Sequence, residues 1–200
     1  MAKSITQAQE NDWTSLAAAT VAESAAIDFS TSYGGTITIQ AFLDSVTAHE
    51  GTEFIVQGRA LTADEDWCDI IRFLALDGTA VAPTISDNPL ASASTTINLS
   101  SSTGLGTPGG KWAAIEDATL ANSELILVKD ASTATAITIL DGTINSHVLN
   151  TVVYSIAIST PIFIGVEHGI VRVVINNNYD DDGTASSLNW RILSAKVSIT

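Results

Sequence analysis

The residues with the clearest capacity for chemistry are three consecutive carboxylates, Asp180, Asp181 and Asp182, which follow the asparagine run at residues 176–178. Carboxylate and amide oxygens are the ligands that calcium prefers, and a loop of Asp and Asn can bring several of them together. The run lacks the alternating Asp spacing and the distal Glu of an EF-hand loop. The same residue types also form solvated turns, because Asp, Asn and Gly tolerate left-handed backbone angles. These three aspartates are therefore a candidate metal site, with a solvated turn as the favoured interpretation.

The histidines and the cysteine show no spacing typical of a site. His49, His147 and His168 each lie beside a turn, without the i, i+4 pairing or cysteine partner of a metal centre, and we expect exposed loop histidines. The single cysteine, Cys68, excludes an internal disulfide and a site built from several thiolates. Cys68 has no basic neighbour that would activate it, so we expect a buried structural thiol.

No pattern of a catalytic or cofactor site is recognisable. The chain has no Gly-x-Ser-x-Gly motif, and its glycine-rich stretch at residues 104–110 lacks the Gly-Lys-Ser/Thr ending of a phosphate-binding loop. We therefore predict no enzyme activity and no cofactor. Trp190 could stack with Arg191 and Arg172, and packing in the core is favoured over a role in carbohydrate binding for the tryptophans.

Composition excludes two classes of partner. The chain has 22 acidic and 8 basic residues, for a net charge of −14. Direct nucleic-acid binding requires clustered Lys and Arg, so it is not expected. No apolar run approaches the roughly 20 residues of a membrane helix, and the N-terminus has no signal-peptide core. The protein is expected to be made in the cytoplasm and to remain there until it is released.

The pattern of apolar residues predicts an all-β fold. Ile, Val and Thr alternate over residues 36–41, and short apolar runs separated by Gly, Asn and Asp turns recur along the chain without a long helix. Residues 170–175 are apolar on both faces, apart from Arg172, and predict an interior strand. Together with residues 188–199 they are expected to form a C-terminal hairpin closed by the Asn/Asp/Gly loop.

We predict an antiparallel β-sandwich, jelly-roll-like, with an inserted smaller β module and a mostly irregular N-terminal arm. The arm would be residues 1–31, rich in Ala, Ser, Thr and Gln. The outer sandwich would comprise residues 32–84 and 152–200. Pro, Ser, Thr and Gly are enriched where the inserted module would begin, and this module would span residues 85–151.

Three groups of residues resemble a family of tailed-bacteriophage virion structural proteins of the head decoration type. They are residues 49–57 with 64–67, residues 95–99 with 116–128, and residues 172–178 with 190–191 and 194–197. The resemblance covers about half of the chain and carries no catalytic residues. It implies a structural protein of the virion, assembled in the host cytoplasm.

The function expected from this resemblance is that of a capsid decoration, or cement, protein. Such a protein would bind the major capsid protein or other virion proteins and would self-associate, with a trimer expected. A tail, neck or fibre component is the first alternative. A carbohydrate-binding β-sandwich module is the second, and it would need exposed tryptophans on one face.

Overall fold

The computed structural model describes residues 3–60, 66–105, 110–177 and 186–199. Within these ranges the chain forms three antiparallel sheets and a single-turn 3-10 helix, which confirms the predicted all-β class. None of the helical structure in these ranges has the length and apolar character needed to cross a membrane. The elements are β1 (Lys3–Gln9), β2 (Thr14–Leu16), β3 (Val21–Glu23), β4 (Ile27–Asp28), β5 (Gly35–Leu43), β6 (Ala48–Arg59), β7 (Cys68–Thr79), β8 (Thr96–Asn98), β9 (Lys111–Glu116), η1 (Leu120–Asn122), β10 (Glu124–Thr133), β11 (Ala136–Ile139), β12 (Val152–Tyr154), β13 (Ala157–Ile164), β14 (Ile170–Asn176) and β15 (Leu188–Ile199).

Two of the sheets form a sandwich with the strand order of a jelly roll. Sheet A has the order β1-β15-β5-β13, with β2 also paired to β15. Sheet B has the order β3-β14-β6-β7, with β4 also paired to β14. The paired strands are nested, β1 with β15, β3 with β14, β5 with β13 and β6 with β7, so that the chain behaves as one long hairpin rolled into two sheets. The predicted jelly-roll-like sandwich is confirmed.

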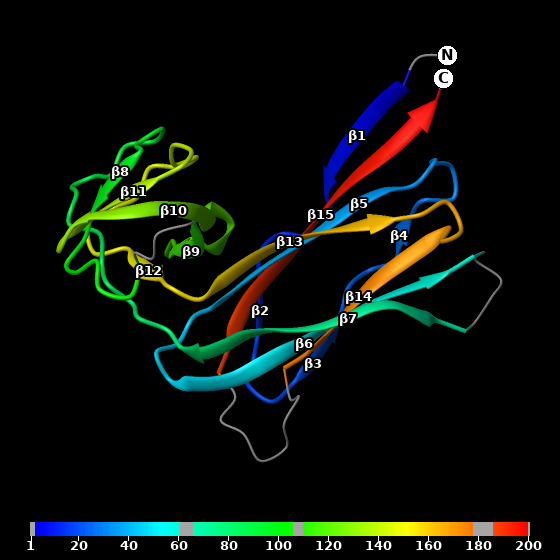
Figure 1. Ribbon diagram of the computed structural model, residues 1–200, viewed down its shortest axis with the longest axis horizontal. Coiled ribbons are helices and arrows are strands. Elements are labelled where there is room, and N and C mark those ends of the chain that lie inside the picture. Colours follow the sequence, from blue (N-terminus) through cyan, green and yellow to red (C-terminus); the bar gives the residue numbers. More distant parts are fainter. Residues whose placement is uncertain (1–2, 61–65, 106–109, 178–185, 200) are drawn as a thin grey trace.

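The third sheet is formed by the chain between β7 and β13. Its order is β12-β9-β10-β11-β8, and it lies to one side of the sandwich in Figure 1. It has its own buried cluster, which includes Ile97, Ile115 and Ile137, each fully buried. The positions of the predicted domain boundaries remain predictions.

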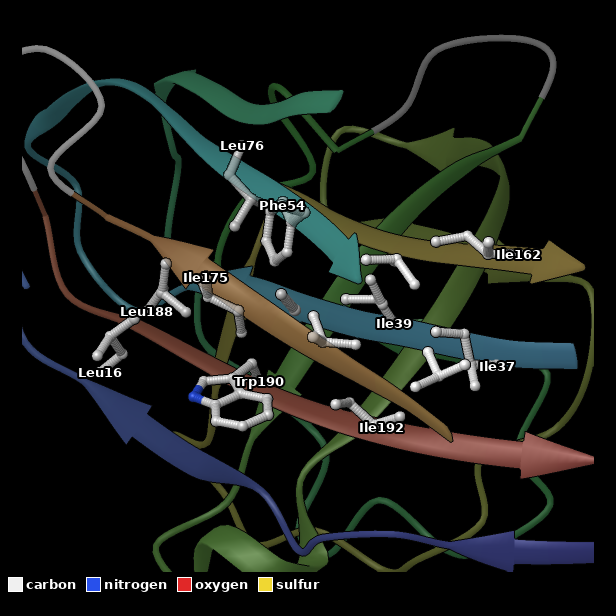
Figure 2. Packing of buried hydrophobic residues seen from close by; sticks show 14 of the residues in the cluster. Leu16, Ile37, Ile39, Phe54, Leu76, Ile162, Ile175, Leu188, Trp190 and Ile192 are labelled. Atoms are coloured by element: carbon white, nitrogen blue, oxygen red, sulfur yellow. The ribbon is translucent and has the colours of Figure 1, made fainter. Parts of the chain in front are cut away.

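The alternation of apolar and polar side chains along the strands produces the sandwich core. Ile37, Ile39 and Ala41 are fully buried, as their spacing predicts. Figure 2 shows Ile37 and Ile39 in the same core as Phe54 and Ile175 of sheet B. Burying an Ile or Phe side chain contributes about 1.5–3 kcal/mol relative to leaving it in water. The core therefore fixes the two sheets relative to each other, and with them the side chains on their outer faces.

The predicted C-terminal hairpin is wrong. β14 is an interior strand of sheet B, as its apolar residues predict, but β15 belongs to sheet A and pairs with β1, β2 and β5. The apolar side chains of the two strands, such as Ile175 and Trp190, belong to the same core, with one strand in each sheet (Figure 2). Pairing within one sheet would have left one of these apolar rows without the opposing layer that it needs.

The N-terminal segment, predicted as a mostly irregular arm, carries four strands of the sandwich. β1 and β2 pair with β15, and β3 and β4 pair with β14, so the segment contributes to both sheets. Its strands are short and, for β1, exposed on both faces, which is why the sequence shows no apolar period there. The two ends of the chain lie side by side, away from the third sheet (Figure 1).

Cys68 is exposed, contrary to the prediction of a buried thiol, because β7 is the edge strand of sheet B. We expect the native protein to react with one equivalent of a thiol reagent such as DTNB per chain, without denaturant. The final absorbance of the DTNB reaction, compared between protein in buffer and protein in guanidinium chloride, checks this prediction. A thiol that titrates only after unfolding would contradict the exposed position.

Candidate functional site

The outward-facing side of sheet A carries one charge among its described side chains, that of Arg191, which donates a hydrogen bond to Gln40 and lies over the ring of Trp13. Side chains alternate along each strand, so the positions between the buried ones point away from the core. The register aligns these positions in rows, such as Gln7, Ala195, Thr36 and Phe163. We call this surface the uncharged face, and it consists of Ile5, Gln7, Gln9, Thr36, Thr38, Pro161, Phe163, Leu193, Ala195 and Val197.

The uncharged face combines exposed apolar side chains with a shallow groove. Phe163 is 75% exposed and Ile5 is 61% exposed. A groove of about 370 Å³ is lined by residues of β1, β5 and β15: Gln7, Ala8, Gln9, Thr38, Leu193, Ser194 and Ala195. Because no Asp or Glu belongs to this face, another protein can cover it without desolvating a carboxylate. Depletion of charge together with an aromatic side chain is the composition of the centre of a protein interface.

The outer face of sheet B is of the opposite kind. A network of side-chain hydrogen bonds and ion pairs crosses β3, β14, β6 and β7, in the order Glu23, Arg172, Gln57, Asp69, Arg72 and Glu53. Arg72 is 54% exposed, and exposed ion pairs of this kind contribute about 0–1 kcal/mol each. Sheet B therefore presents a solvated, charged surface. The two outer faces of the sandwich therefore differ in charge.

A cleft of about 530 Å³ lies between the sandwich and the third sheet. Three carboxylates line it, Asp44, Glu116 and Asp117, and Asn189 donates hydrogen bonds to Asp44 and Glu116, at 3.2 and 3.1 Å. Burial, and then the nearby charge of Asp44, raise the pKa of Glu116. Burial, followed by the charges of Glu116 and Asp44, raises the pKa of Tyr154 to about 12. A carboxyl group with a raised pKa beside a second carboxylate is one arrangement used in acid–base chemistry. Here the amide of Asn189 bonds to both Asp44 and Glu116, and it thereby connects the sandwich to the third sheet.

His147 is part of a buried charged cluster in the third sheet. Its Nε2 lies 2.6 Å from Oε1 of Glu124, and its Nδ1 lies 3.2 Å from Oδ2 of Asp117. Carboxylate oxygens only accept hydrogen bonds, so both ring nitrogens carry a proton. Burial alone would lower the pKa of His147, but the hydrogen bonds to Glu124 and Asp117 outweigh it, and the pKa is raised. The prediction that His147 is an exposed loop histidine is wrong, since the residue is fully buried.

This cluster gives the protein a pH-dependent contribution to stability. The pKa of His147 in the folded protein lies above its ordinary value of 6.5, so the charged ring stabilises the fold fully below pH 6.5. As the pH rises through the raised pKa, this stabilisation is lost, at about 1.4 kcal/mol per pH unit for one proton.

We expect the difference in unfolding free energy between the wild type and His147→Gln to be largest below pH 6.5 and to shrink as the pH rises. Urea unfolding of both proteins across a pH series measures it. A difference that is constant with pH, or that grows with it, would show that the ring is neutral in the folded protein.

His49 is also buried, contrary to the prediction, but it is held in the neutral form. Its Nδ1 accepts a hydrogen bond from the backbone N–H of Ser186 at 3.1 Å, so Nε2 carries the proton and donates to Thr52 at 2.9 Å. Burial lowers the pKa of His49. Thr52 in turn donates to Asn177, whose amide donates to the backbone carbonyls of Ala17 and Ser186. The chain of bonds joins β6 to the start of β15 and to the N-terminal segment.

The remaining sequence predictions have mixed outcomes. Asp180, Asp181 and Asp182 lie outside the described residues, so the metal site stays a prediction, and among the described residues no group of three His, Cys, Asp or Glu could hold a metal. Trp190 is in the core, as favoured, but it is not the partner of the arginines. Arg172 lies over the ring of Trp67 at 4.5 Å, and Arg191 lies over the ring of Trp13, also at 4.5 Å.

The uncharged face could not be recognised from the sequence. Its residues come from four strands, and only the register of β1, β15, β5 and β13 places them side by side. The one local signal lies in β5, where the polar uncharged residues Thr36, Thr38 and Gln40 alternate with buried apolar residues.

Comparisons with known proteins give only weak similarities. No family model matches the chain, and no curated protein matches it. Among solved structures, VP17, a capsid protein of bacteriophage P23-77, aligns with 100% of this chain and 98% of its own, at a TM-score of 0.22 and 5% sequence identity. A structure of the Gx strain of infectious bursal disease virus aligns with 100% of this chain and 42% of its own, at a TM-score of 0.21 and 12% identity. The fold assignment accordingly rests on the strand order.

Proposed function

We propose that this protein is a non-enzymatic structural component of a bacteriophage virion, and that it is a head decoration, or cement, protein which binds the outer capsid lattice. The observation that carries the proposal is the uncharged face on the outside of a strongly acidic jelly roll. Jelly rolls serve as virus capsid domains and as lectins, so the fold is compatible with a binding role in a particle. The resemblance of the sequence to tailed-phage virion proteins supports a partner within the particle, and we propose the capsid lattice as that partner.

The proposed mechanism is the addition of buried surface between neighbouring capsomers. A stable protein interface covers about 800 Å² of each partner, and its uncharged centre gains free energy without a desolvation cost for charges. A subunit that contacts two capsomers adds surface that must be exposed again before they separate. The shell is thereby stabilised against internal pressure, and no substrate is converted. The net charge of −14 keeps the remaining surface soluble and suits a basic docking surface.

The positions of the tryptophans do not favour the carbohydrate-binding alternative. Stacking on a sugar requires an exposed aromatic face. Trp13 and Trp190 are 6% and 5% exposed, Trp67 and Trp112 are half-buried, and the guanidinium groups of Arg59 and Arg172 lie over the ring of Trp67. Phe163 is the large exposed aromatic residue of the uncharged face.

Quantitative mass spectrometry of purified virions tests the location. Hundreds of copies per particle are expected for a lattice-binding protein, with loss of shell stability when the protein is stripped by mild treatment. A handful of copies would assign it to the tail, neck or fibre. Absence from virions would overturn the proposal.

A substitution at Phe163 tests whether the uncharged face is the docking surface. Phe163→Ser should weaken binding of the purified protein to stripped capsids at least ten-fold, since removing a central aromatic side chain typically costs more than 1 kcal/mol. Leu74→Ser, on the outer side of sheet B and 49% exposed, is the matched control and should bind normally. Equal binding by both variants would exclude the uncharged face as the docking surface.

A further inference from the structure

The four edges of the sandwich differ in how they are protected against pairing with another strand. Proteins protect exposed edges with proline, with charged side chains or with very short strands. β13 carries Pro161, β7 carries Asp69 and Arg72, and β3 and β4 are three and two residues long. β1 has none of these features between Ser4 and Gln9.

The backbone of β1 is oriented for pairing on its open side. The N–H and C=O of Val197 bond toward Gly34 and Tyr33, on the β5 side, so Ile5, which lies opposite Val197, makes no ladder bond to β15. Hydrogen-bonded and non-bonded positions alternate in an antiparallel ladder. The N–H and C=O groups of Ile5, Gln7 and Gln9 therefore point away from β15. No strand in the described ranges covers that edge.

The side chains of β1 are as accessible as its edge. All residues from Ser4 to Gln9 are exposed, although they form a strand with a regular partner. Ile5 is 61% exposed and lies opposite Val197 at the end of the uncharged face. A strand exposed on both faces contributes little to its own core, so its exposed side chains and its open edge remain available for an interface.

We propose that β1 pairs in an antiparallel manner with β1 of a second copy of this chain, so that sheet A continues through two molecules. The second copy is the occupant that the strand itself fits, because an antiparallel two-fold contact brings the same strand from both molecules together, and the uncharged residues from Ser4 to Gln9 place no like charges opposite each other. A two-fold axis at Thr6 places the outward-facing backbone of Ile5 opposite that of Gln7 in the second copy. The same axis places Gln7 of the first copy opposite Ile5 of the second. The contact deepens the proposed function by supplying its self-association, as a two-fold dimer in place of the expected trimer.

Sedimentation velocity and light scattering on the purified full chain test the pairing. The wild type should have twice the chain mass of 20.8 kDa. Gln7→Pro removes an N–H that faces the open edge, a position at which an edge strand tolerates proline. It should be monomeric with an unchanged circular dichroism spectrum. Gln7→Thr changes the same side chain but keeps the N–H, and it should remain dimeric.

Hydrogen–deuterium exchange on the wild-type protein provides a second test, which does not require that any variant folds. In the dimer, the amides of Ile5, Gln7 and Gln9 should exchange with deuterium at least ten-fold more slowly than after dilution to the monomer. A wild-type monomer at high micromolar concentration, a trimer, or a dimer that persists in Gln7→Pro would each overturn the pairing. Since these measurements use the isolated protein, they can fail while virion binding succeeds, and the reverse also holds.

Discussion

Replacing Trp13 by alanine is expected to lower the free energy of unfolding by about 3–5 kcal/mol, the cost of truncating a buried aromatic side chain. Trp13 precedes β2 but packs at the junction of the sandwich and the third sheet. Its ring meets Phe42 of β5 edge-on at 5.1 Å, and its indole N–H donates to the backbone carbonyl of Ser123 at 2.7 Å. Ala114 of β9 completes the buried cluster. The substitution therefore removes an apolar contact and leaves the carbonyl of Ser123 without its donor.

Urea unfolding checks this prediction, and the melting temperature should fall by roughly 10 °C for a chain of this size. Trp13→Phe is the matched control. It keeps most of the buried ring and loses the N–H, so it should cost about 1–3 kcal/mol. Because Trp13 couples the two parts, the alanine variant should also unfold in two steps. A loss below 1 kcal/mol would show that the junction is held by other contacts.

The second large effect is expected for Glu124→Ala. The carboxylate of Glu124 is 2% exposed and accepts hydrogen bonds from Nε2 of His147 and from the backbone N–H groups of Ile144 and Asn145. Removing it leaves three donors without this acceptor, one of them the ring N–H of the fully buried His147. Breaking a buried ion pair from one side typically costs about 3–5 kcal/mol.

Hydrogen exchange resolved by residue locates this effect. The third sheet should lose protection in Glu124→Ala, while the sandwich should keep it. Glu124→Gln retains the shape and one carbonyl oxygen, so it should cost less, and it should flatten the pH dependence that His147 contributes. An equal loss of amide protection in the third sheet and in the sandwich would show that the stabilising effect of the cluster is not confined to the third sheet.

The two buried histidines illustrate how the same side chain acquires opposite protonation states. His147 faces two carboxylates and is charged, whereas His49 accepts a backbone N–H and is neutral. Both lie in polar networks that connect segments far apart in the chain, with Glu124 and Ser186 lying 23 and 137 residues away from their histidines. Local sequence shows neither partner, so an exposed loop was the natural expectation for each.

The strand class and the interior positions followed from the sequence, because they depend on local alternation. Residues 36–41 alternate and form β5 with its apolar side buried, and residues 170–175 are apolar except for Arg172 and form the interior strand β14. The net charge of −14 is likewise a property of composition alone.

Only the tertiary structure decided which strands pair and what the outer faces present. A hairpin and two strands facing each other across a core require the same apolar pattern, so β14 and β15 looked like neighbours in one sheet although they belong to two. The uncharged face depends on the register of four strands that are distant in sequence, and the open edge of β1 depends on what the other strands leave uncovered. Local periodicity reports whether a side chain turns toward a core, but pairing between distant segments is set by the packing of the whole chain.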